Sequence, residues 1–114
     1  MKAEKFEDLI VWQRAKQLAV VIFKKFELNR NYSLRDQIQR ATVSISNNIA
    51  EGFERKGNKE LKHFLFIAKG SCGEVRSMLH LSLELNYIPK DEYESLLDEA
   101  LTISKMLSAF IKTL

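Results

Sequence analysis

Residues 33–55 read SLRDQIQRATVSISNNIAEGFER, and this stretch decides the fold. It is long enough for about six helical turns at 3.6 residues per turn. Its apolar residues recur in steps of three and four, which places them on one side of a helix and predicts a buried face. That face comprises Leu34, Ile38, Ala41, Ile45, Ile49 and Gly52. Ser33 followed by Asp36 resembles a capping box, so we expect the helix to begin at Ser33.

Three further segments have the same helical spacing of apolar residues, at 8–27, 59–86 and 90–113. Asp8 can cap the first of them, and Pro89 suits the first turn of the last. Four helices of this length joined by short connections favour an antiparallel up-down-up-down bundle. We therefore predict an all-α fold in which the 114 residues form a single four-helix-bundle domain.

Glycine stands inside two of these helices. Gly52 costs about 1 kcal/mol relative to alanine in a helix interior. We interpret it as the site of a close helix crossing, with access of a ligand to the backbone as the alternative. Gly70 and Gly73 flank two small residues in the middle of the third predicted helix, and we expect close packing there too.

The composition is that of an ordinary globular chain that can bury a core, with 46% hydrophobic and 29% charged residues. The net charge of +3 is unevenly distributed, because residues 14–76 are basic and residues 89–114 are mildly acidic. A basic region permits an anionic partner such as RNA, with ordinary solvated charge as the alternative. The amino terminus lacks the features of a signal peptide, and no apolar run has the length of a membrane span. We expect a cytoplasmic protein with no membrane role.

The sequence offers no set of residues for catalysis or metal binding. Cys72 is the lone cysteine and falls on the apolar face of the third predicted helix, where cysteine behaves as a small hydrophobic residue. His63 and His80 are too few for a zinc site. The acidic residues near the end of the second predicted helix stand beside Arg55 and Lys56, which favours an ion-paired helix end. We predict no enzymatic activity, no metal and no cofactor.

Basic residues form a row on one side of the third predicted helix, in steps of three and four. The row comprises Lys62, Phe66, Lys69, Gly73, Arg76 and His80, and Arg55, Lys56 and Lys59 extend it. Basic side chains neutralise phosphates and Phe66 offers a stacking surface, a combination expected of a single-stranded nucleic-acid binder. The alternatives are an ordinary cationic helix face and a subunit interface sealed by Phe66.

A ridge of polar residues runs beside the apolar face of the second predicted helix. It includes Arg40, Ser44, Glu51 and Arg55, and Asn48 lies between the ridge and the apolar face. We expect Arg40 and Glu51 to join Asn48 in a hydrogen-bonded network between helices or between subunits.

Three stretches of the chain resemble a known family. They are DLIVWQRAKQL at 8–18, LRDQIQRATVSISNNIAEGFER at 34–55 and FLFIAKGSCGEV at 64–75. The family is that of four-helix-bundle proteins first named for their genes, which lie in intervening sequences of bacterial 23S ribosomal RNA. The most specific part is QRATVSISNNIAEGFER at 39–55, in which Ser46 stands where many members have proline.

The resemblance implies a small bacterial cytoplasmic bundle that assembles into a ring-like pentamer and has no established enzymatic activity. Relatives include an accessory protein of diversity-generating retroelements, which binds nucleic acid and a reverse transcriptase through a basic surface. The apolar arc of helix 8–27 is itself wide enough for two neighbours, one of which could be another subunit. We therefore expect a non-enzymatic homo-oligomer that binds RNA or a nucleic-acid-processing partner. The alternative is a purely structural assembly protein with no nucleic-acid role.

Overall fold

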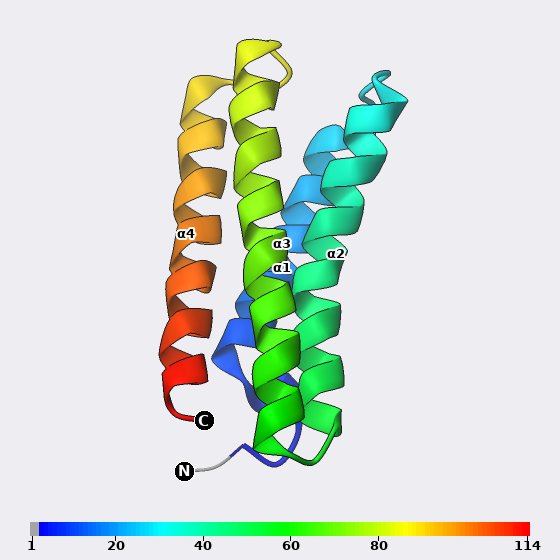
Figure 1. Cartoon of the computed structure of the whole chain (residues 1–114). Helices are drawn as coiled ribbons and strands as arrows, with labels where there is room; N and C mark the ends of the chain where they lie inside the picture. The colour runs from blue at the N-terminus through cyan, green and yellow to red at the C-terminus, as the bar shows by residue number, and fades with distance from the viewer. Residues whose placement is uncertain (1–2) are drawn as a thin grey trace.

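A computed structural model describes residues 3–114 and contains four long helices that pack side by side (Figure 1). A short 3₁₀ turn at Phe6–Asp8 leads into the first of them. The long helices are α1 (Ile10–Phe26), α2 (Tyr32–Glu54), α3 (Asn58–Glu84) and α4 (Lys90–Lys112). Each predicted helix is confirmed, with bounds that agree within two residues at both ends.

The helices alternate in direction along the chain, as the colour gradient of Figure 1 shows. Contacts between helices agree with this order: Ser44 of α2 bonds to Ser71 of α3, and Gly52 further along α2 lies against Phe64, which comes earlier in α3. The predicted antiparallel four-helix bundle is therefore confirmed. None of the helices in the described chain has the length and apolar character needed to cross a membrane.

The core lies along the common axis of the four helices and is built from the predicted apolar faces. The largest side chains with essentially no exposure to solvent include Phe26, Ile22, Ile38, Ile45, Ile49, Leu65, Leu79, Ile103 and Leu107. Of the four pairs of neighbouring helices, α2 with α3 packs most tightly and α1 with α4 most loosely.

The expected cap at Ser33 is wrong. Helix α2 begins at Tyr32, and its cap is Asn31, whose side-chain oxygen accepts a hydrogen bond of 3.1 Å from the backbone nitrogen of Leu34. This bond satisfies one of the free donors of the first turn. Asp8 does not cap α1 either, because it lies in the preceding 3₁₀ turn and the cap position is occupied by Leu9.

Helix α3 is followed by a left-handed residue, Asn86, whose φ is 59°. The Asn86 nitrogen donates to the Leu83 carbonyl at 3.0 Å, and the Tyr87 nitrogen donates to the Ser82 carbonyl at 2.9 Å. These are the two bonds of a Schellman motif, which closes the last helical turn. At the same end of the bundle the Asn31 amide donates to the Tyr87 hydroxyl at 3.1 Å, which ties the α1–α2 connection to the α3–α4 connection.

Close packing was expected at Gly52 and at Gly70 and Gly73, and the structure shows it only at Gly52. A Cβ atom at Gly52 would lie 2.8 Å from Phe64 Cβ and 3.2 Å from Leu61 Cδ1, so the close crossing of α2 and α3 is confirmed. Gly70 and Gly73 have no neighbouring atom within 4 Å of an added Cβ. The expectation of close packing at these two positions is therefore wrong within one chain, because this side of α3 faces outward.

Candidate nucleic-acid interface

The row predicted on α3, from Lys62 to His80, lies on the surface of the bundle, and we call it the basic row. Seven residues advance about 10.5 Å along a helix, so Lys62, Lys69 and Arg76 follow one another at that spacing. Lys62 and Lys69 are exposed and Arg76 is half-buried. None of the ion pairs in residues 3–114 includes these three cations. The Phe66 ring, between the two lysines, is 53% exposed.

Arg55, at the connection between α2 and α3, differs from these free cations. Its guanidinium donates to Glu51 at 2.8 Å, lies 3.6 Å from Glu60 and stacks 5.1 Å from the Phe64 ring centre. The hydrogen bond to Glu51 is the largest cause that raises the pKa of Arg55. The expected ion-paired helix end is confirmed, and the charge of Arg55 is already compensated within the chain.

Lys56 and Lys59 continue the row beyond Arg55 and are both exposed. Lys59 lines a surface hollow of about 510 Å³ together with Arg55, Glu60, His63 and Phe64. Arg55, Lys56 and Lys59 thus lie at the end of the row nearest the α2–α3 connection, where Glu51 and Glu60 compensate the charge of Arg55.

At the other end of the row, His80 contacts the neighbouring helix. Its Nδ1 lies 2.8 Å from the Tyr93 hydroxyl of α4, within hydrogen-bond distance. This contact links α3 to α4 at the surface of the bundle.

The predicted network of Arg40, Asn48 and Glu51 does not form within one chain. The Asn48 amide donates to the Ser44 carbonyl at 2.7 Å and to the Ser44 hydroxyl at 2.9 Å, and the Ser71 hydroxyl donates to the same Ser44 hydroxyl at 2.9 Å. Glu51 pairs with Arg55 instead. A network between subunits stays a prediction.

Arg40 lies at a groove between α2 and α3 and forms no ion pair in the described part of the chain. The groove has a volume of about 460 Å³ and is lined by Gln37, Arg40, Ala41, Ser44 and Glu74.

The hydrogen bond of Ser71 to Ser44 was not predicted from the sequence, although a serine on a buried helix face is a signal for an interhelical hydrogen bond.

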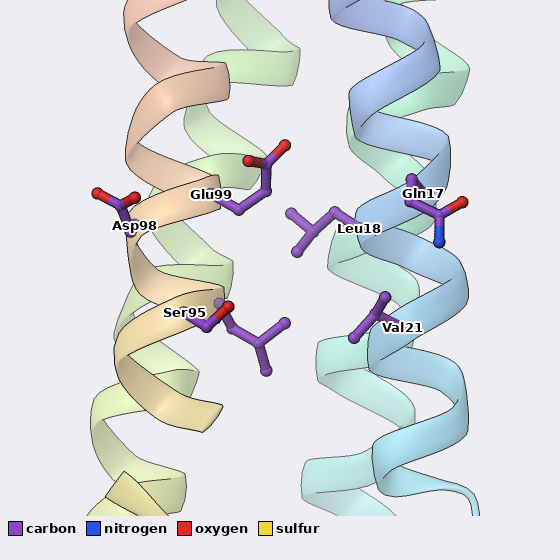
Figure 2. A pocket seen from close by; sticks show the side chains of 7 residues that line it. Gln17, Leu18, Val21, Ser95, Asp98 and Glu99 are labelled. Carbon is purple, nitrogen blue, oxygen red and sulfur yellow. The ribbon is translucent and has the colours of Figure 1, made fainter. Parts of the chain in front are cut away.

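A second groove, of about 280 Å³, separates α1 from α4 (Figure 2). Leu18 and Val21 of α1 point across it toward α4, whereas Asp98 points away. Two ion pairs bridge the same helices: Arg14 to Glu99 at 2.6 Å, and Lys25 to Glu92 at 2.7 Å. The hydrogen bond to Glu99 is the largest cause that raises the pKa of Arg14. The groove is lined by both apolar and polar side chains, and the Glu99 carboxylate at its edge is engaged by Arg14.

Metal binding and the reactivity of Cys72 can both be assessed within the described residues. Residues 3–114 contain no group of three or more histidine, cysteine, aspartate or glutamate side chains placed to hold a metal ion. Cys72 is fully buried, and burial raises the pKa of its thiol to about 12, with a smaller opposing effect of the Arg76 charge. At neutral pH the thiol is protonated and inaccessible, as expected of a structural cysteine.

We therefore expect Cys72 to resist alkylation at pH 8 in the native protein and to react once the protein is unfolded.

The raised pKa of Cys72 also makes the stability of the protein depend on pH. Above the pKa of about 8.5 that a free thiol has, the unfolded state loses its proton while the folded state keeps it, so stability falls as the pH rises toward 12. Chemical denaturation between pH 8 and pH 9.5 should show this loss, and Cys72→Ala should reduce it. If the parent and Cys72→Ala lost the same stability over this pH range, the loss would not come from the Cys72 thiol.

The chain is similar to known proteins over almost its whole length. The family model for 23S rRNA-intervening sequence protein matches residues 7–109. A crystal structure of a protein of unknown function from the S23 ribosomal protein family of Bacteroides thetaiotaomicron is 29% identical, with a TM-score of 0.84. The match covers 90% of this chain and 96% of that one. No curated protein matches the chain. With four helices in the fold of that structure and a family match over residues 7–109, the chain belongs to the 23S rRNA-intervening sequence protein family.

Proposed function

We propose that this protein is a non-enzymatic cytoplasmic homo-oligomer, a pentameric ring, that binds RNA through the basic row of α3. The observation that carries the proposal is the set of three cations at a regular spacing, Lys62, Lys69 and Arg76, none of which has an acidic partner within residues 3–114. The exposed Phe66 ring adds a surface on which a base can stack. The family resemblance supports both the nucleic-acid role and the ring.

Binding by such a row has a defined physical character. Each phosphate neutralised by a cation releases counterions, which contributes roughly −0.7 to the slope of log affinity against log salt for a single strand. The contacts are made to the backbone and to ring faces, so little base preference is expected. In an oligomer the row is repeated in each subunit, and modest contacts combine through effective concentration.

The test compares the parent protein with the variant Lys62→Glu, Lys69→Glu, Arg76→Glu. We expect the variant to lose most of its affinity for single-stranded RNA and its salt slope to become shallower by roughly 2, because three phosphate contacts are removed. Fluorescence anisotropy with labelled RNA at low and moderate salt measures both quantities. Structured RNA is measured in parallel.

A matched control separates local from overall charge. Lys5→Glu, Lys90→Glu, Lys105→Glu makes the same change in net charge at three exposed positions outside α3. We expect this control to retain most of the affinity. Equal affinity in a basic-row variant that remains folded would place the RNA site elsewhere. A parent that binds no RNA at low salt would favour the purely structural assembly, or a protein partner such as a reverse transcriptase.

A further inference from the structure

Helix α1 presents a cationic and partly apolar row to solvent. Its four ionisable residues are all basic. Arg14 and Lys25 are used inside the chain by their ion pairs with α4, whereas Lys16 and Lys24 are exposed and enter no ion pair in residues 3–114. Val20 lies midway between these two lysines on the same side of the helix and is 39% exposed. We call Lys16, Val20 and Lys24 the α1 row.

Helix α3 presents a row of opposite charge. Glu74, Ser77, Leu81 and Glu84 follow one another in steps of three and four, and all four are exposed. The two glutamates form no ion pair within the described chain, and Leu81 is 47% exposed. Just before this α3 row lies Gly70, beside which an added Cβ would meet no atom within 4 Å. The α3 row thus combines two unpaired acids with an unpartnered apolar side chain and room for a close approach.

The two rows lie at matching heights along the bundle. Lys25 pairs with Glu92, and His80 contacts Tyr93, the next residue of α4, so Lys25 and His80 are about level. Arg14 pairs with Glu99, which lies as far below Tyr93 on α4 as Glu74 lies below His80 on α3. The two alignments of α1 with α3 differ by about 7.5 Å, since 11 residues of α1 rise about 16.5 Å and six residues of α3 about 9 Å. Their mean puts Lys16 near the height of Glu74 and Lys24 near that of Leu81, within a turn of Glu84. The midpoint of the α1 row, Val20, is level with Ser77.

We propose that the α1 row of one subunit packs against the α3 row of the next subunit. This inference rests on the oligomeric part of the proposed function. Rotation about an axis parallel to the helices carries one subunit to the next without a shift along that axis, so residues at equal height meet. Lys16 then faces Glu74, Lys24 faces Glu84, and Val20 packs near Ser77 and Leu81.

Charge argues for this head-to-tail pairing against pairing of like rows. Two copies joined through α1 would bring four unpaired lysines together, and two copies joined through α3 would bring four unpaired glutamates together, both of which are repulsive. Helices α1 and α3 have no Cα atoms within 8 Å of each other, whereas each of them packs against both α2 and α4, so they lie diagonally across the bundle. One subunit therefore offers its two rows on different sides, as a closed ring of identical subunits requires.

The interface leaves the proposed RNA site free. On a helix each residue is turned by about 100° from the one before it. Lys69 of the basic row and Gly70 beside the α3 row thus point in clearly different directions, and the basic row lies toward α4, where His80 contacts Tyr93. One helix can then carry the subunit contact on one side and the RNA contact on another.

Charge reversal tests the pairing. We expect Lys16→Glu, Lys24→Glu to reduce the solution mass from a multiple of 13.2 kDa to that of a single chain at micromolar concentration, as measured by light scattering after size exclusion. Glu74→Lys, Glu84→Lys should do the same. Combining all four changes in one chain restores opposite charges across every interface and should restore the assembly. Circular dichroism of each variant establishes that it remains helical.

Disulfide trapping tests the register independently of charge. Cysteines at Val20 and Ser77 in one chain should form covalent ladders of subunits under mild oxidation, since a disulfide needs Cα atoms closer than about 7 Å. Val20→Cys alone and Ser77→Cys alone should give no ladder, and neither should Val20→Cys with Ile67→Cys, because Ile67 lies about 15 Å lower on α3. The native Cys72 is buried and does not compete.

The outcomes separate the two proposals. A parent protein that is monomeric at micromolar concentration would overturn both the oligomer and its interface. A parent that is oligomeric, with variants that keep their assembly and cysteine pairs that form no ladder, would overturn this interface and leave the oligomer standing. Loss of assembly on reversal of either row without rescue by the combined variant would also contradict direct pairing of the two rows.

Discussion

Gly52→Val is expected to destabilise the bundle by about 3 kcal/mol. An added Cβ at this position would already lie 2.8 Å from Phe64 Cβ, an atom bonded directly to the backbone of α3, so the side chain cannot turn away. The two methyl groups of valine enlarge the overlap, and the two helices must separate where they are packed most tightly. Urea denaturation followed by circular dichroism measures the loss, and Gly52→Ala should give a smaller effect of the same sign.

The control for this substitution is Gly73→Val in the interior of α3. No atom lies within 4 Å of a Cβ added at Gly73, so only the helix propensity changes. Valine and glycine differ in propensity by roughly 0.5 kcal/mol, in favour of valine. A Gly73 variant as unstable as the Gly52 variant would show that the loss comes from valine in a helix and would remove the close crossing as its cause.

The second large effect is expected for Phe26→Ala. Phe26 is the largest of the fully buried side chains, and its truncation should cost about 3 to 5 kcal/mol through lost apolar burial and the cavity that remains. Phe66→Ala removes the same atoms from a ring that is 53% exposed and should cost far less. Thermal melts of both variants at one protein concentration make the comparison, and equal losses would mean that Phe66 is covered in the assembled protein.

The helices could be predicted from the sequence because the residues buried in a bundle are apolar and recur with helical spacing along every helix. Ile38, Ile45 and Ile49 recur with helical spacing, and each is fully buried. The caps could not be predicted with the same accuracy. Asn31 and Ser33 are both good capping residues only two positions apart, and the choice between them depends on the path of the α1–α2 connection.

Features that depend on two helices at once were harder to predict. The spacing within α3 correctly placed Lys62, Lys69 and Arg76 on one side of that helix. It carried no information on the pairing of Arg55 with Glu60, which depends on the turn between α2 and α3. The Ser44–Ser71 hydrogen bond likewise joins residues of different helices. The sequence shows that Gly70 has no side chain, but it does not show whether a neighbouring helix fills the space beside it. The structure shows that this space is open.

The seam between α1 and α4 has a consequence for the order of folding. The tight α2–α3 hairpin is made by neighbours in sequence and can form early, because short loops are closed at low entropic cost. The seam joins the two ends of the chain, and its Arg14–Glu99 contact spans 85 positions. We expect its closure to come late. Besides apolar burial, it is held by two ion pairs between partly exposed side chains, whose attraction is screened by dissolved ions. Salt should thus act on the final docking of the outer helices more than on the hairpin that forms first.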